Sequence, residues 1–159
     1  MNGSGSTSGT KKSLREDGVD LANRVRTKLR EVGLLPTRTR IALGSLLFTS
    51  GDRHVTAETL LDEAKQARVQ VSLATIYNTL HQFTEVGFLR QVPIDSSKLY
   101  FDTNNAEHHH FYVEDRQELI DISAADMVVG RTPAPPSGYE IAHIDIVVRL
   151  RRKLTSQKV

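Results

Sequence analysis

Three consecutive histidines, His108, His109 and His110, follow Glu107 and are the strongest candidates for chemistry in the chain. In an extended segment the side chains alternate between two faces, so His108 and His110 would point one way, and Glu107 and His109 the other. One tract can therefore supply ligands to two separate sites. A histidine run can also lie in a solvated loop, but this one lies inside an acidic part of the chain, directly before a predicted strand.

Other histidines could join such sites, because His143 and Asp145 lie two residues apart on a predicted strand and His54 precedes a predicted helix. The chain has no cysteine, which excludes disulfides, thiolate zinc sites, iron–sulfur clusters and a cysteine nucleophile. The remaining nitrogen and oxygen donors suit ferrous iron, manganese or zinc, and imidazoles beside an apolar pocket can also ligate haem iron. His143 could equally be a packed surface residue, and His54 an ordinary loop histidine.

The sequence contains no recognisable catalytic motif. It has no Ser-His-Asp arrangement, no Gly-rich phosphate loop and no H-E-x-x-H helix. We therefore expect that the protein is not an enzyme. A metal-dependent enzyme or a haem-trafficking protein remains the alternative from another functional class.

The predicted helix that begins after Ser72 and ends before Gly87 is a candidate for binding DNA. Its core face has apolar residues at steps of three and four, namely Leu73, Ile76, Leu80 and Phe83. A second face is short, polar and aromatic, and it lacks the alternating charges of a merely solvated helix. We predict that this helix reads base edges in the major groove through Thr75, Tyr77, Asn78 and His81. The Tyr77 ring suits thymine methyls and the Asn78 amide suits adenine, which favours an A/T-rich operator.

The elements that would position this helix follow from periodicity and capping. One helix over residues 14–32 has an apolar stripe of Leu21, Val25, Leu29 and Val32. Thr37, Thr56 and Ser72 are placed to begin three further helices. Residues 88–102 form two strand-like runs around Asp95-Ser96-Ser97, which predicts a hairpin. Three helices followed by a hairpin describe a winged helix-turn-helix.

The second half of the chain predicts a small sheet. Residues 111–113, 118–122 and 139–150 are strand-like, residues 123–130 predict a short helix, and residues 131–138 are a Pro-rich loop. Such a small part has little core of its own, so we expect it to build a homodimer. The expected fold class is α+β, with a flexible tail (1–13), a winged-helix DNA-binding domain (14–102), an α/β dimerisation and sensor domain (103–153) and a basic tail (154–159).

The formal net charge of the 159 residues is only +2, but the charge is divided along the chain. Residues 11–40 carry nine Lys/Arg against four Asp/Glu, whereas residues 102–148 carry two against nine. A basic first part suits DNA, and we predict that Arg24, Arg38 and Arg40 contact phosphates. An acidic second part with four of the six histidines would concentrate metal cations. The chain has no apolar run of membrane-spanning length and no signal-peptide pattern, so we expect a cytoplasmic protein without a membrane partner.

Five motifs, in order, resemble those of the ferric uptake regulator superfamily over residues 24–150. They are Gly33…Thr37-Arg38-Thr39-Arg40, His54-Val55-Thr56-Ala57-Glu58-Thr59-Leu60, Ala74-Thr75-Ile76-Tyr77-Asn78-Thr79-Leu80, Glu85-x-Gly87 and the histidine tract. The resemblance implies a homodimer of winged-helix domains joined by α/β dimerisation domains, with metal or effector sites at the hinge and in the second domain. Its partner would be double-stranded DNA.

The resemblance also implies ligand sets for bound metal. The hinge set would be His54, Asp102, His108 and His110, and a second set would include Glu107, His109 and His143. The remaining position of the second set falls near Val128, with Asp126 as the neighbouring carboxylate. The zinc-binding C-x-x-C of many members is replaced by Val113 and Arg116, so no structural four-cysteine zinc site is expected.

Finer features are similar to the iron response regulator branch of the superfamily. These features are Asn78 after Tyr77, the plain histidine tract and the run KLYFDTN. This resemblance implies a repressor of iron and haem homeostasis genes that responds to haem through His108, His109 and His110, with a haem-synthesis partner. The Cys-Pro haem motif of some members is absent. The alternative with the same fold is a repressor that senses ferrous iron or manganese directly.

Overall fold

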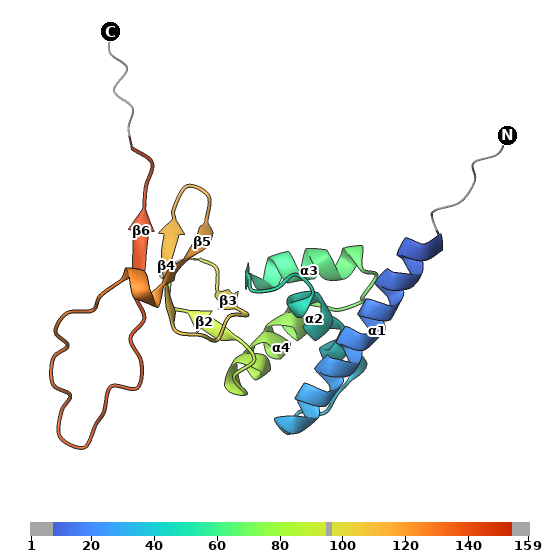
Figure 1. The fold of residues 1–159 in the computed structure, drawn as a ribbon, viewed down its shortest axis with the longest axis horizontal. Coiled ribbons are helices and arrows are strands. Elements are labelled where there is room, and N and C mark those ends of the chain that lie inside the picture. The colour runs from blue at the N-terminus through green and yellow to red at the C-terminus, as the bar shows by residue number, and fades with distance from the viewer. Residues whose placement is uncertain (1–7, 95–96, 154–159) are drawn as a thin grey trace, which may run out of the picture. The chain divides into compact units, whose positions relative to one another are not determined.

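The computed structural model describes the backbone of residues 8–94 and 97–153, and side chains from residue 18 onward. The chain divides into two compact units (Figure 1). The first comprises Met1–Gln91 and Lys98–Asn105, and the second comprises Val92–Ser97 and Ala106–Val159. None of the described helices is long and apolar enough to cross a membrane.

Four helices build most of the first unit: α1 (Ser8–Glu31), α2 (Arg38–Phe48), α3 (Ala57–Gln66) and α4 (Leu73–Glu85). The side chains of Thr37, Thr56 and Ser72 each accept a hydrogen bond from the backbone N–H three residues later. These bonds satisfy N–H groups that a helix start leaves without partners. The capping positions predicted from the sequence are therefore confirmed. Gly87 has a positive φ of 76° just after α4, as expected of a glycine stop.

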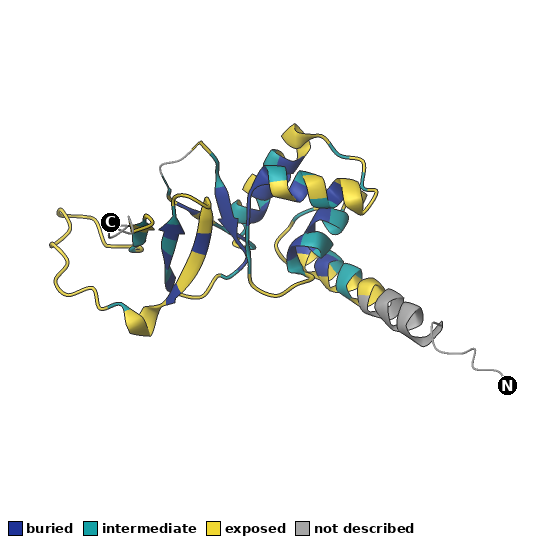
Figure 2. Ribbon diagram, turned by 90° about the horizontal axis from the view of Figure 1, so that it is seen from above, coloured by how far each residue is buried: buried dark blue, intermediate teal, exposed yellow. Residues whose placement is uncertain are grey.

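The four helices enclose a continuous apolar core, and Figure 2 shows their buried strips beside exposed ones. Its fully buried members include Leu29, Leu43, Leu47, Leu60, Ile76, Leu80 and Phe83. Two residues of the predicted stripes are not in this core, because Val32 and Leu73 are each 37% exposed. Val32 lies beyond the last residue of α1, and Leu73 is the first residue of α4. The predicted stripes therefore extended one residue too far at these two helix ends.

A three-stranded sheet completes the helical unit. It contains β1 (His54–Val55), β2 (Arg90–Val92) and β3 (Tyr100–Asp102), in the order β1-β3-β2. Strands β2 and β3 are the two arms of the predicted hairpin, whereas Asp95 and Ser96 of its turn lie outside the described residues. Strand β1 was not predicted, because two residues are too few for an alternating pattern. It pairs with β3 so that His54 lies opposite Asp102.

The second unit contains a separate three-stranded sheet. Strand β4 (His108–Val113) lies between β5 (Glu118–Ser123), which is antiparallel to it, and β6 (Val147–Leu150), which is parallel. The predicted last strand, residues 139–150, is therefore a strand only in its final part. The predicted helix at 123–130 is a single 3-10 turn, η1 (Ala124–Asp126). Two β-branched valines and Gly130 follow this turn and disfavour helix continuation.

The unit boundaries differ somewhat from the predicted domain boundaries. Helix α1 begins at Ser8, inside the segment predicted as a flexible tail up to residue 13. A helix that is already formed extends at little cost through residues such as Lys11 and Lys12. The first unit ends at Asn105 rather than at residue 102. Residues 1–7 and the predicted basic tail at 154–159 lie outside the described residues.

Candidate metal centre and DNA-reading surface

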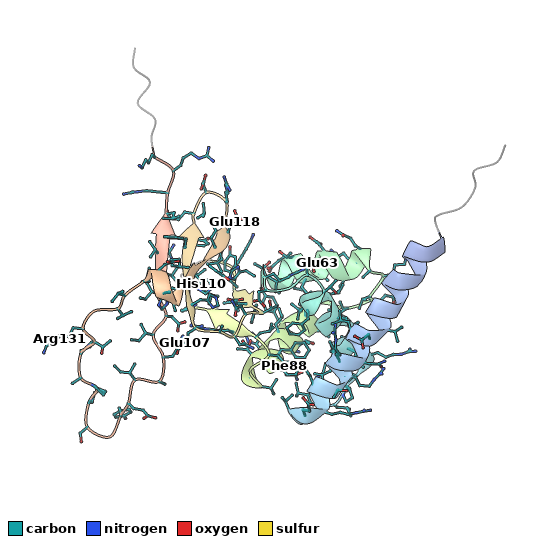
Figure 3. The ribbon with its side chains drawn as sticks, in the orientation of Figure 1. Glu63, Phe88, Glu107, His110, Glu118 and Arg131 are labelled. Carbon is teal, nitrogen blue, oxygen red and sulfur yellow. The ribbon has the colours of Figure 1, made fainter. Side chains whose placement is uncertain are left out.

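The histidine tract forms the first half of β4, and burial alternates along it. His108 and His110 are buried, at 5% and 3% exposure, whereas His109 is half-buried. The Nε2 atoms of His108 and His110 lie 3.0 Å apart (Figure 3 labels His110). Two nitrogen ligands in adjacent positions around one ion, each at about 2.0–2.1 Å, would be about 3 Å apart. The spacing of this pair therefore fits a shared metal ion.

Asp121 adds a carboxylate to the histidine pair. The β4–β5 register places it opposite His110, and its Oδ1 lies 3.6 Å from Nε2 of His108 and 3.8 Å from Nε2 of His110. These three ligand atoms lie within 4.8 Å of one another. Asp121 was not among the ligands predicted from the sequence, because its place depends on strand register and not on sequence spacing.

A backbone contact sets the orientation of His108. Its Nδ1 lies 2.7 Å from the carbonyl oxygen of Ala106. If Nδ1 carries the proton and donates it to this oxygen, the lone pair is on Nε2, which is the form that ligates a metal ion. The backbone just before β4 thus turns the imidazole toward Asp121.

His54 and Asp102 form a second histidine–carboxylate pair, which belongs to the first unit. Nε2 of His54 lies 3.4 Å from Oδ2 of Asp102. Asp102 is fully buried, and its Oδ1 accepts a hydrogen bond of 2.8 Å from the Asn104 backbone N–H. A buried carboxylate is costly without a positive partner, which a protonated histidine or a cation can supply.

The second predicted ligand set lines a pocket of about 300 Å³ in the second unit. Glu107, His109 and His143 all contribute to its wall. The His109 Nδ1 atom is buried and has no hydrogen-bond partner among the described residues. His143 lies 3.1 Å from Asp145 through Nε2 and Oδ1. Asp126, the neighbouring carboxylate named from the sequence, is exposed and is not among the lining residues.

The polar face predicted on α4 is accessible. Ala74, Thr75, Asn78 and His81 are exposed, and Tyr77 is half-buried. The Tyr77 and His81 rings are stacked, with centroids 6.4 Å apart and planes 22° apart. This face of α4 is therefore exposed and free of covering chain among the described residues.

Tyr77 is also fixed at its hydroxyl, which donates a 2.9 Å hydrogen bond to Oε1 of Glu58 on α3. Burial, then the bond to Glu58, raises the pKa of the Tyr77 phenol. The pKa of the Glu58 carboxyl is lowered, mostly by its own backbone N–H and further by the Tyr77 hydroxyl, against burial. Both directions favour a neutral phenol that donates to an ionised carboxylate.

The three predicted phosphate-binding arginines have different surroundings. Arg38 is exposed, and Arg24 is exposed with a 3.5 Å ion pair to Asp20. Arg40 instead donates two bonds to the side-chain oxygen of Gln82 and one to the Leu35 carbonyl oxygen. The guanidinium of Arg40 therefore links α2 to α4, in addition to the phosphate contact predicted from the sequence.

The chain was compared with protein families and with known proteins. The family model "Ferric uptake regulator family" matches residues 31–149. The ferric uptake regulation protein of Pseudomonas aeruginosa is 27% identical over 129 residues, which cover 80% of this chain and 96% of that protein. The peroxide-responsive repressor PerR of Staphylococcus aureus is 30% identical over 116 residues, covering 72% of this chain and 78% of that protein.

The solved structures agree with the sequence relatives. The structure of the ferric uptake regulator of P. aeruginosa with manganese has a TM-score of 0.64 and 26% identity, over 82% of this chain and 98% of that chain. The predicted fold class is confirmed by this likeness. These relatives are regulators and not enzymes, which agrees with the expectation for this chain. The chain belongs to the ferric uptake regulator family.

Proposed function

We propose that this protein is a homodimeric transcription regulator that binds a DNA operator and responds to ferrous iron or manganese. One observation carries the proposal, namely the convergence of His108, His110 and Asp121 in the second unit. Two imidazole nitrogens and one carboxylate oxygen are a donor set that suits ferrous iron, manganese or zinc.

The residues of β4 and β5 fit a bound cation. The 3.0 Å approach of the His108 and His110 nitrogens is favourable if a cation accepts both lone pairs. Metal binding needs both imidazoles neutral, so protons and metal compete for this pair. Asp121, His108 and His110 would all bind the positive charge that the cation supplies.

Metal binding has to be linked to DNA binding for regulation. The family resemblance adds His54 and Asp102 to the proposed ligands of this ion. A ligand changes a conformational equilibrium only through its different affinities for the two arrangements. The His54–Asp102 pair, with its buried carboxylate, is the support for this assignment within the first unit.

Glu107, His109 and His143 are proposed to hold a second ion. They line one pocket, and the buried Nδ1 of His109 lacks a partner among the described residues. An unpaired buried polar atom costs free energy that a bound ligand recovers. This set supplies only three protein ligands, because Asp126 does not line the pocket.

DNA binding is proposed to use α4 for bases and the basic helices for phosphates. Thr75, Tyr77, Asn78 and His81 would contact base edges, and Arg24, Arg38 and Arg40 would contact the backbone. Exposure of three of the four α4 residues supports the first assignment. We propose an A/T-rich operator on the chemistry of Tyr77 and Asn78.

Haem is the second candidate effector, and it rests on the resemblance to the iron response regulator branch. Haem iron needs an axial ligand with an open side for the macrocycle. His108 and His109 both line the pocket, but His108 is buried, so the half-buried His109 is the pocket imidazole that favours haem. In this version the protein represses iron and haem genes in the cytoplasm and has a haem-synthesis partner.

A DNA selection with and without metal tests the proposal. The full-length protein is stripped with a chelator and incubated with random duplexes, with Mn²⁺ or with chelator alone. We expect A/T-rich duplexes to be enriched with Mn²⁺, and their affinity to fall about tenfold or more without it. The double variant His108→Ala with His110→Ala should lose this response, whereas Asp126→Asn, an exposed carboxylate that does not line the pocket of the second set, should keep it. Equal binding with and without metal would exclude metal regulation.

A haem titration separates the two effectors. Absorbance spectra of the stripped protein with haem are compared for the parent, His109→Ala and the double variant. Direct metal sensing predicts that the double variant loses the Mn²⁺ response while its haem spectrum is unchanged. Haem sensing predicts that His109→Ala alters the haem spectrum and abolishes release of the selected DNA by haem.

A further inference from the structure

Glu58 is the one acidic residue that holds a side chain of the proposed base-reading face by a hydrogen bond, among the bonds found in the described residues. It lies in the first turn of α3, and Tyr77 lies on α4. The Tyr77 hydroxyl donates to Oε1 of Glu58 over 2.9 Å. A carboxylate beside the proposed DNA surface is unfavourable for phosphate binding, so its place there needs a separate explanation.

The Tyr77 ring is restrained along its length as well as at its hydroxyl. His81 stacks against it, and the His81 ring in turn lies edge-on to Phe101 at 5.8 Å. Phe101 is fully buried in the core of the first unit. The Tyr77 side chain is therefore held at its hydroxyl by Glu58 of α3. Its ring is held by His81, which contacts the buried Phe101. A restrained side chain loses little entropy when it binds a partner.

We propose that Glu58 is a specificity-determining positioning residue that commits the hydroxyl hydrogen of Tyr77, so that the phenol oxygen meets DNA only as a hydrogen-bond acceptor. The inference rests on the proposed base-reading role of Tyr77. A free tyrosine hydroxyl both donates and accepts, and could pair with any base edge. With its hydrogen on Glu58, the oxygen pairs with the amino groups of adenine or cytosine and not with the acceptors of guanine or thymine.

Three variants separate positioning from charge. Glu58→Gln keeps a side-chain acceptor for the Tyr77 hydroxyl, whereas Glu58→Ala removes it, and both remove one negative charge. Glu63→Gln is the matched control, because Glu63 lies on the same helix but pairs with Arg53. All three should therefore raise non-specific DNA affinity by similar amounts, which isolates any change in base preference.

Each variant is tested on a duplex that the parent selects with Mn²⁺, and on the same duplex with its adenines and cytosines replaced one at a time. The measured quantity is the ratio of the affinity for the selected duplex to the affinity for each replaced duplex. We expect Glu58→Ala to lower this ratio about tenfold at one base-pair position, and Glu58→Gln and Glu63→Gln to keep it. In a Tyr77→Phe background, Glu58→Ala should have no further effect, because Glu58 acts through the hydroxyl. Equal ratios for the parent and Glu58→Ala, or independent losses in the double variant, would overturn the inference.

A spectroscopic readout checks the hydrogen bond without DNA. Phenolate absorbance is titrated in the parent and in Tyr77→Phe, and the difference isolates Tyr77 from the other tyrosines. Glu58→Ala should let Tyr77 ionise at lower pH than in the parent, while Glu63→Gln should leave the titration unchanged. An unchanged Tyr77 titration in Glu58→Ala would show that no such bond exists in solution. If the parent enriches no duplex at all, base reading by α4 fails and the inference fails with it.

Discussion

Asp121 is the single residue that tests the metal centre most directly. Asp121→Asn keeps the size of the side chain but removes the charge that lies 3.6 Å from His108 and 3.8 Å from His110. We expect the affinity for Mn²⁺ to fall at least about 10–100-fold, the loss that even an outer hydrogen-bond partner of a metal ligand causes. Competition with a fluorescent chelator measures this change. Asp126→Asn is the control, because Asp126 is exposed on the turn after β5, and equal losses in both variants would contradict the assignment.

Glu58 predicts a pH dependence of stability. Its pKa is lowered in the folded protein from an ordinary value of 4.5, first by its backbone N–H and then by the Tyr77 hydroxyl. The unfolded chain therefore holds this proton more tightly, so the stabilisation is complete above pH 4.5 and is lost as pH falls through the lowered pKa. The difference in unfolding free energy between the parent and Glu58→Gln should shrink as pH falls from about 6 to 3. Urea denaturation over this range measures it, and a difference that grows toward acid pH would contradict the sign.

At the residue scale, the sequence predicted side-chain faces better than side-chain partners. The alternation of the tract depends only on strand geometry, and His108 and His110 do share a buried face. Asp121 depends on the register between β4 and β5, and the bond from Tyr77 to Glu58 depends on how α3 packs on α4. Neither register nor packing angle is encoded in local spacing, so these partners were missed.

At the element scale, we expect alanine substitution at two helix glycines to change stability in opposite directions. A Cβ on Gly44 of α2 would lie 2.7 Å from Cγ1 of Val25 on α1, and a β-branched valine has little freedom to move away. Gly44→Ala should therefore destabilise the protein by about 1–3 kcal/mol. A Cβ on Gly18 of α1 meets nothing within 4 Å, so Gly18→Ala should stabilise by about 0.5–1 kcal/mol. Thermal or urea denaturation measures both, and a Gly44→Ala variant as stable as the parent or more stable would show that α1 and α2 do not pack this closely.

The start of α4 offers a test of the cap that positions the base-reading face. The Ser72 hydroxyl accepts the Thr75 backbone N–H at 3.2 Å. Ser72→Ala should cost about 1 kcal/mol of unfolding free energy, and Ser72→Asp, which keeps an acceptor, should cost little. Equilibrium urea denaturation gives both values. Equal losses for Ala and Asp would place the cost in side-chain packing instead of the cap.

The elements were predicted well where a cap or a long apolar stripe marks them. Thr37, Thr56 and Ser72 each begin a helix, because a capping side chain acts on its own neighbouring backbone. Strand β1 is two residues long, and β6 is shorter than its alternating sequence, since pairing with β4 is made only from Val147 onward. Short strands exist through their partners, and local sequence carries no information about those partners.

At the scale of the whole molecule, the charge distribution separates the two proposed activities. The basic residues of α1 and α2 belong to the first unit, and the acidic block with four histidines belongs mostly to the second. Each exposed cation that contacts a phosphate releases counterions, so affinity for DNA depends on salt through the number of such contacts. A metal cation bound in the acidic block would reduce its negative charge and hence its repulsion of DNA.

Arg38 and Arg40 give the sharpest test of which arginines contact DNA phosphates. Arg38 is exposed, so Arg38→Ala should leave the free energy of unfolding within about 0.5 kcal/mol and lower the slope of log affinity against log salt by about one unit. Arg40 donates to Gln82 and to the Leu35 carbonyl, so Arg40→Ala should cost about 1–3 kcal/mol of stability by leaving these acceptors without their donor. Anisotropy titrations of one duplex at several salt concentrations give the slopes, and urea denaturation gives the stabilities. An unchanged slope for Arg38→Ala or for Arg40→Ala would remove that arginine from the proposed phosphate contacts.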